Sequence, residues 1–519
     1  MPKEWVIWIT IGVYVAFMVV VGLLGRRGTK SMAEFTVGGR NAGAWMSALS
    51  YGTAYFSAVM FIGYAGGTGW KYGIWGVLPG IGNAVIGSLL AWLVLARRTR
   101  ETTRRLKIKS MPQFFDRRFD SRSMKLFATV VIFVFLLPYS ASVYKGLTSI
   151  CSVLLGVDEQ VCMIVIALAS LAVVVLGGYA ATLKADFVQG IIMIVGVVAL
   201  IAAVIRCDTV GGLQAGLEAI SAETEKLQLG WKDHLGLWAT VLMTSFGTWG
   251  LPQMIHKYYG IRDDKEVRRG TVISTGFALL VAGGGYFIGS LSHLFFTELP
   301  SPPGGGAGHP DYLIPNMLVQ AGLPTVLLGV VLVLLIAASV STLSSITLTA
   351  SSTVTMDLIQ DRIAPQMKKE TAPRLTKGLC TVFILLSYVI ANTHTPILDM
   401  MSYSWGILSG AFLAPYMISL YWKRINRAGA WAGMLGGFVV AAPPVVCKLF
   451  FPSATLPLFG KVMDCGPHFA CLAMVVSFLL CLVVSALTHR QPNPAFYGEE
   501  PTEEKLTENA LQNEPLGVQ

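Results

Sequence analysis

The sequence predicts an all-α polytopic membrane protein with about thirteen transmembrane helices. Only 13% of its 519 residues are charged and 54% are hydrophobic, whereas soluble proteins carry about 25% charged residues. The mean hydropathy is +0.62. The apolar runs are about 20 residues long, which is what a helix needs to cross a hydrocarbon core of about 30 Å.

Thirteen such runs can be placed along the chain. They lie near residues 5–24, 43–65, 74–96, 124–152, 159–178, 183–206, 236–255, 269–296, 324–356, 374–393, 397–421, 428–450 and 466–488. The first run has no small-residue cleavage site and is followed by Arg26 and Arg27, so we expect a retained helix rather than a signal peptide.

The basic residues predict how the protein is oriented in the membrane. With the N-terminus outside, 31 of the 39 lysines and arginines fall on the inner side, as the positive-inside rule requires. We therefore expect a protein of the plasma membrane, specifically a bacterial inner membrane, with a cytoplasmic C-terminus. The net charge of +10 follows from this topology and requires no nucleic-acid partner.

We expect one transmembrane domain at residues 1–488 and a short disordered cytoplasmic tail at 489–519, because the tail is polar and Glu-rich. The eight cysteines form no CxxC motif and the seven histidines no metal-spaced pair. The sequence has no Ser/His/Asp set and no phosphate loop. We therefore predict neither an enzyme nor a cofactor.

Two spans carry residues that interrupt helices. The span at 43–65 mixes small residues with paired aromatics, and the span at 236–255 ends with Gly247, Gly250 and Pro252. Interruptions five spans apart suggest two inverted repeats of five helices, with ligand bound at unwound backbone near the midplane. The repeat core would cover about 43–421, with one helix before it and two after it.

One apolar stretch, residues 333–358, is unusually rich in hydroxyls. Helical spacing places Ser341, Ser344, Ser345 and Ser352 along one stripe. Each hydroxyl could simply bond to the carbonyl one turn earlier. Alternatively, the stripe could supply neutral oxygens for a hard cation such as sodium.

Charged and aromatic residues within the spans are further candidates. Asp186 is either a functional carboxylate or an interfacial partner of Lys184. Lys145 either reaches outward to the interface or faces a central cavity as the counter-charge of an anionic substrate. Tyr144 and Trp249 either stack on a substrate or serve as packing and interfacial residues.

The chain resembles the solute:sodium symporters over about residues 5–450. The resemblance rests on several segments in the family's order: SMAEFTVGGRNAGAW, MPQFFDRRF, GLPQMIHKYYGIRDDKEVRRG, SVSTLSS and LAPYMISLYWKRINRAGAWAGMLGG. It implies the LeuT fold, with a five-plus-five inverted-repeat core. It also implies a sodium-coupled symporter that imports a small organic solute by alternating access and functions as a monomer in the lipid bilayer.

The resemblance also implies binding residues. The first sodium would be held by carbonyls of Thr53, Phe56 and Ala338 and by the hydroxyls of Ser341 and Thr342. A second sodium would use Asp186, Ser344 and Ser345. The substrate would lie beside the two helix breaks, with the candidate residues Ala54, Tyr55, Ser57, Tyr144, Lys145, Thr248 and Trp249.

Three positions depart from family patterns. Tyr55 replaces an Asp of the proline carriers, Met60 replaces a His of the sugar carriers, and Lys257 replaces the usual Arg. The segments GLPQ and FIGYAGGTGWKYG look most similar to the pantothenate-type branch of the family, and Lys145 would suit a carboxylate. We therefore expect a carboxylate substrate such as pantothenate, a monocarboxylate or an amino acid. The alternative function is an uncoupled or proton-coupled facilitator or channel of the same fold.

Overall fold

The computed structural model describes residues 40–303, 305–368, 371–393, 395–457 and 459–488, together with positions 9, 12–14, 16 and 20. Apart from those few positions, the predicted first helix at 5–24 lies outside the described residues. The predicted tail at 489–519 lies wholly outside them.

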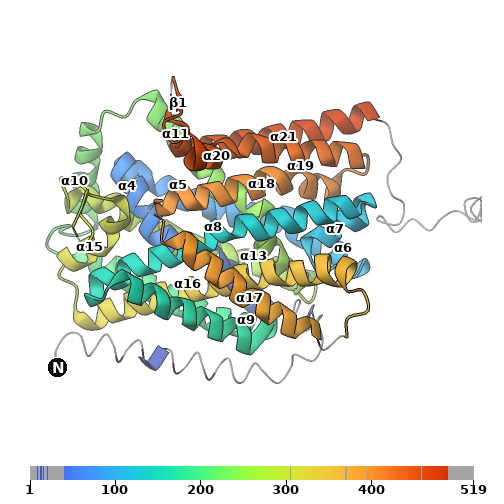
Figure 1. Ribbon diagram of the computed structural model, residues 1–519. Coiled ribbons are helices and arrows are strands. Elements are labelled where there is room, and N and C mark those ends of the chain that lie inside the picture. Colours follow the sequence, from blue (N-terminus) through green and yellow to red (C-terminus); the bar gives the residue numbers. More distant parts are fainter. Residues whose placement is uncertain are drawn as a thin grey trace, which may run out of the picture.

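The described residues form a bundle of helices whose axes are mostly aligned with one another (Figure 1). Turns of 3-10 or π geometry, labelled η, interrupt several of them.
The elements of the first part are α3 (Ala44–Tyr55), η3 (Val59–Ala65), α4 (Gly66–Tyr72), η4 (Gly73–Val77), α5 (Leu78–Gly82), η5 (Asn83–Leu90), η6 (Trp92–Ala96), α6 (Arg97–Arg105), α7 (Met111–Phe119), α8 (Arg122–Leu155), α9 (Glu159–Arg206) and α10 (Leu213–Lys226).
Those of the middle part are α11 (Trp231–Phe246), η7 (Gly247–Gly250), α12 (Pro252–Tyr259), α13 (Asp264–Ala278), η8 (Leu279–Gly283), α14 (Gly284–Ser290), η9 (Leu291–Leu294), η10 (Pro310–Tyr312) and α15 (Leu313–Gln320).
Those of the last part are α16 (Thr325–Thr353), η11 (Val354–Ile363), α17 (Thr371–Ala391), α18 (Ile397–Tyr421), α19 (Arg427–Ala441), α20 (Pro443–Phe450), the two-residue strands β1 (Thr455–Leu456) and β2 (Gly460–Lys461), η12 (Val462–Cys465) and α21 (Gly466–Thr488).

The helices agree with the predicted spans in most places. Within the described residues, eight helices are long and apolar enough to cross a membrane, or nine if the bent pair α19–α20 counts as one span. The all-α membrane class is thus confirmed, while the exact count of thirteen is not. Helices α18 and α21 have the predicted bounds, 397–421 and 466–488.

The spans expected at 159–178 and 183–206 both lie within the helical segment α9. Thr182–Arg206 is long and apolar enough to be a membrane span of its own, close to the predicted 183–206. Glu159, at the start of α9, accepts a hydrogen bond from Tyr312 of η10, and α10, which follows the end of α9, packs against η9. Because α15 packs against both η9 and η10, the two ends of α9 lie at the same end of the bundle, as two antiparallel spans require.

Both predicted helix breaks are present. Helix α3 ends at Tyr55, and Phe56 then adopts extended φ and ψ of −107° and 116°. The other broken span is α11, η7 and α12, in which Leu251 is extended with φ −81° and ψ 120°. Pro252 begins α12, where its missing N–H costs nothing.

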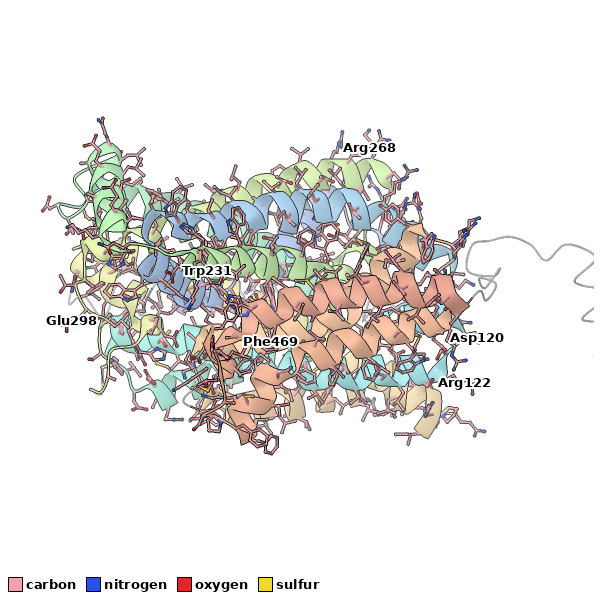
Figure 2. The ribbon with its side chains drawn as sticks, turned by 90° about the horizontal axis from the view of Figure 1, so that it is seen from above. Asp120, Arg122, Trp231, Arg268, Glu298 and Phe469 are labelled. Atoms are coloured by element: carbon pink, nitrogen blue, oxygen red, sulfur yellow. The ribbon has the colours of Figure 1, made fainter. Side chains whose placement is uncertain are left out.

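Charged residues mark the two ends of the bundle. Asp120, Arg122 and Arg268 lie at one end and Glu298 lies at the other (Figure 2). We call these the Arg268 end and the Glu298 end. The segments around Asp120 and Arg268, which were predicted to lie on the same membrane side, therefore lie at the same end of the bundle, and Glu298, predicted to lie on the other side, lies at the opposite end.

Helix α16 carries the hydroxyl-rich stretch through the interior. It packs against α3, α8, α9, α12 and α17, and Ser339, Ser341, Thr342 and Ser344 are at most 1% exposed. A helix apolar or small on every side is expected to be surrounded by other helices. Its hydroxyls therefore face protein rather than lipid.

Close helix crossings depend on particular glycines. A Cβ on Gly69 of α4 would lie 1.8 Å from the carbonyl oxygen of Gly289, and one on Gly289 would lie 2.1 Å from that of Ala65. No side chain can move aside here, because the obstruction is backbone. Small residues permit this kind of approach between membrane helices.

We expect Gly69→Ala to lower the thermal stability of the detergent-solubilised protein, because overpacking costs about 1–3 kcal/mol. The matched control is Gly276→Ala in α13, where a Cβ would meet no described atom within 4 Å and helix propensity should improve. Thermal unfolding followed by light scattering measures both. Equal melting temperatures for the two variants would contradict the close-crossing argument.

Candidate ion and substrate site

A group of oxygens joins the break of α3 to helix α16. The Thr342 hydroxyl lies 3.0 Å from the carbonyl oxygen of Thr53 and 3.0 Å from that of Ala338. The Ser341 hydroxyl lies 3.0 Å from Thr53 Oγ1. Four of the five residues predicted for the first sodium are thus brought together, and carbonyl and hydroxyl oxygens are the ligands that hard cations prefer.

The fifth residue, Phe56, stands at the break itself. Its extended conformation removes it from the helix, and the next turn is closed by Met60 N donating to Ser57 O. Ser57 Oγ accepts from Val59 N, and Ser339 Oγ accepts from Ala58 N. Side chains of this region and of α16 therefore satisfy backbone groups that the interruption releases.

A buried ion pair adjoins this oxygen group. Asp186 of α9 is 0% exposed, and its Oδ2 lies 3.0 Å from the ammonium of Lys257 in α12. Its Oδ1 accepts a hydrogen bond from Ser341 at 2.5 Å. The Asp186 carboxylate is therefore not an interfacial group but part of the same network as the first predicted sodium site.

The second predicted sodium set is divided in the structure. Ser345 Oγ lies 2.9 Å from the Lys257 ammonium. The buried hydroxyl of Ser344, in contrast, has no hydrogen-bond partner among the described residues. Ser50 of α3, which the sequence did not single out, completes the group, with its Oγ 2.5 Å from Asp186 Oδ2 and 2.9 Å from Lys257 Nζ.

Aromatic rings gather beside the break of α3. The Tyr55 ring stacks on Phe56 at 4.2 Å between centroids, and Trp405 of α18 lies 6.1 Å from Tyr55. Trp405 also meets Tyr139 of α8 edge-on at 5.6 Å. Ala54, the residue before Tyr55, is fully buried. The side chains beside this part of the break are therefore uncharged and mostly aromatic.

Tyr55 is fixed by a hydrogen bond across the bundle. Its hydroxyl donates to the carbonyl oxygen of Thr244 in α11 at 2.7 Å. Tyr55 therefore connects the two broken spans, α3 and α11, at the position where proline carriers are expected to have an Asp. Its ring and hydroxyl supply no formal charge.

Other substrate candidates lie elsewhere. The Trp249 indole donates to Ile86 O at 3.1 Å, and its ring lines an apolar groove of about 350 Å³ between α11, α18 and α21. Thr248 bonds back to Ser245 O at 2.9 Å. Tyr144 is fully buried within α8. These positions fit packing better than substrate contact.

Lys145 is directed away from the helix breaks. Its ammonium donates to the carbonyl oxygens of Thr393 and Thr395, at 3.1 and 2.8 Å, and it lines a polar cavity of about 390 Å³ with Glu159 and Asp311. The next residue, Gly146, packs against the break instead, since a Cβ there would lie 3.3 Å from Ala58. The ammonium thus holds the α17–α18 connection.

Sequence reasoning missed Ser50, Trp405 and the role of Lys257. Lys257 was noted only as a departure from the family's Arg. A lysine within an apolar span is itself a signal, because such a charge requires a partner. No sequence spacing relates Lys257 to Asp186, 71 residues away.

Two interrupted spans, joined to a hydroxyl-rich helix inside an all-α bundle, define a broken-helix membrane transporter. The comparisons with known proteins agree with this class. The model of the sodium:solute symporter family matches residues 35–437, so the chain belongs to the sodium:solute symporter family.

Curated relatives cover nearly the whole chain. A sodium/proline symporter of Haemophilus influenzae is 27% identical to this chain, and the match covers 91% of this chain and 94% of that symporter. The osmoregulated proline transporter OpuE of Bacillus subtilis is 25% identical, with coverage of 94% and 96%. These are transporters, not enzymes. These relatives do not support the prediction of pantothenate as the substrate, although an amino acid was also among the expected carboxylates.

Solved structures support the fold. A Na⁺-coupled sialic acid symporter in a substrate-bound, outward-open state matches with a TM-score of 0.74 at 18% identity, covering 94% of this chain and 99% of that one. The nucleobase-cation-symport-1 transporter Mhp1 matches with a TM-score of 0.54 at 13% identity, covering 91% and 99%. The predicted LeuT-type architecture is thereby confirmed.

We expect Thr342→Ala to raise the sodium concentration for half-maximal uptake about tenfold, because it removes an oxygen worth roughly 1.4 kcal/mol or more to a cation. Ser341→Ala should act in the same direction. Sodium titration of uptake in proteoliposomes measures both. Ser352→Ala, one stripe position farther along α16, is the control, since its hydroxyl bonds back to Thr349 O. Wild-type sodium dependence in both test variants would exclude this oxygen group from ion binding.

We expect Lys145→Met to leave the half-saturation constant for substrate within about twofold of wild type, since its ammonium bonds the α17–α18 connection. Thermal stability should fall, because two carbonyls lose a charged donor. Lys145→Arg should restore it. A tenfold rise in the half-saturation constant of the Met variant at unchanged stability would instead support the counter-charge role.

Proposed function

We propose that this protein imports a small zwitterionic amino acid of the proline class together with sodium, by alternating access. The contact that carries the proposal is Thr342 Oγ1 between the carbonyl oxygens of Thr53 and Ala338. The sodium would bind there, with Phe56 O and Ser341 Oγ as further ligands. An ion at this point draws the break of α3 toward α16.

The coupling follows from where the ion binds. Ala54, Tyr55 and Ser57 lie within four residues of Thr53, so an ion that orders this backbone also orders the substrate side of the break. Sodium and substrate then bind better together than separately, and the effect is reciprocal. The membrane potential adds about 2.3 kcal/mol per charge per 100 mV.

The surroundings favour an uncharged or zwitterionic solute with an apolar body. The side chains beside the break are Tyr55, Phe56 and Trp405, which offer ring faces for apolar contact and for a substrate ammonium. Lys145 reaches the Thr393 and Thr395 carbonyls instead. The proline-carrying relatives support the same class. Tyr55, which replaces an acidic residue, would favour a substrate held by contact and hydrogen bonding.

For membrane placement, we propose that the Arg268 end faces the cytoplasm, with the N-terminus outside and the C-terminus inside. The basic segment between α6 and α7 and the start of α13 would then meet the anionic inner leaflet. We further propose that the monomer is the transporting unit, since both broken spans and α16 belong to one chain.

Proteoliposomes loaded with potassium and diluted into sodium test the proposal. We expect labelled proline to accumulate above the outside concentration only with the sodium gradient, and excess unlabelled proline to compete more strongly than pantothenate or sialic acid. Proline equilibration without sodium would support the alternative, an uncoupled or proton-coupled facilitator. Sodium-driven uptake of pantothenate but not proline would contradict the substrate class.

A further inference from the structure

The ammonium of Lys257 is enclosed by oxygens. Lys257 is 4% exposed, and its Nζ lies 3.0 Å from Asp186 Oδ2, 2.9 Å from Ser50 Oγ and 2.9 Å from Ser345 Oγ. An ammonium has three N–H donors, and here each has an acceptor from a different helix: α9, α3 and α16. This arrangement of oxygens around a small positive charge resembles the coordination of a metal cation.

The same oxygens were predicted to hold a second sodium. Asp186 and Ser345 are two of the three residues in that set, and both lie within hydrogen-bonding distance of Lys257. An ion bound between them would occupy the volume of the ammonium and repel its charge at close range in a poorly solvated interior. The position can therefore hold the ammonium or the ion, but not both.

The charge of the pair is already balanced. A carboxylate within a membrane span needs a compensating cation, and Lys257 supplies one that cannot diffuse away. The neighbouring cavity, lined by Gln253, Lys257, Ser345 and Thr349, measures only about 10 Å³, at most the space of one water. This cavity therefore leaves no room for an additional hydrated ion beside the ammonium.

We propose that the Lys257 ammonium is a built-in cation that excludes sodium from the second predicted position. It follows that one sodium is carried per substrate, a consequence that rests on the proposed sodium-coupled function. Lys257 then determines the ion stoichiometry. A shorter uncharged side chain would leave Asp186, Ser50 and Ser345 as oxygens around an open space, beside the carboxamide of Gln253, whose polar atoms have no partner among the described residues.

The first test counts sodium ions on purified protein by equilibrium binding of ²²Na⁺, without organic solute. We expect one ion on the wild type and two on Lys257→Ala. Lys257→Arg, which keeps a cation, should bind one. The double variant Asp186→Asn/Lys257→Ala opens the same space but lacks the carboxylate, and it should also bind one ion. It therefore distinguishes the effect of the open space from the effect of the negative charge.

Two ions on the wild type would overturn the inference, and this count needs no variant to fold. A Lys257→Ala protein that binds substrate but gains no ion would overturn it as well. Because the count uses no organic solute, failure of proline transport leaves it intact. Absence of sodium on the wild type would instead overturn the proposed coupling.

The second test measures the charge moved per solute. In proteoliposomes, the reversal potential of labelled proline flux should indicate one charge per zwitterion for the wild type and up to two for Lys257→Ala. A purely structural role for Lys257 would lower the rate without changing this ratio. An unchanged ratio at a measurable rate would therefore contradict the inference.

Discussion

The structure depends on how the backbone polar groups at the helix breaks are satisfied inside the membrane. Each unsatisfied N–H or C=O in a bilayer core costs several kcal/mol, and the break after Tyr55 releases several of them. Helix α16 meets this requirement with hydroxyls, since Ser339 accepts from Ala58 N and Thr342 donates to Thr53 O. The hydroxyl-rich stretch is thus the structural complement of the break. A sodium ion bound at Thr53 O would compete with a hydroxyl for the same carbonyl, so ion binding and helix support are connected.

The buried pair of Asp186 and Lys257 extends this network to α9 and α12. Asp186 Oδ1 accepts from Ser341 and its Oδ2 meets Lys257 and Ser50, so one carboxylate contacts residues of three other helices. Removing one member of such a buried pair is strongly destabilising, because the remaining charge has no partner. The pair therefore holds the interrupted segments α3 and α12 against helices α9 and α16. A change in the hydrogen-bond partners of this pair would alter the position of α3 and α12 relative to α9 and α16.

The two break regions differ in how they are bridged. The break of α3 adjoins hydroxyls, a carboxylate and aromatic rings, and Tyr55 reaches Thr244 across the bundle. Trp249, in the second break, points to an apolar groove between α11, α18 and α21. Hydroxyl, carboxylate and aromatic groups are therefore concentrated at the first break, and the second contributes mainly Lys257 and helix geometry. Lys145, at the Glu298 end, joins α8 to the α17–α18 connection and lies outside this centre.

The sequence by itself determined the membrane class, most span positions, both helix breaks and the family. Those features depend on local quantities: the length of an apolar run, a glycine or proline at a given position, and the order of family segments. The tertiary structure alone decided which side chains meet: that Lys257 faces Asp186 across 71 residues, that Ser50 joins them, and that Lys145 turns away from the break. Such contacts depend on helix rotation and crossing, which the packing of many distant side chains sets together and which no single stretch of sequence encodes.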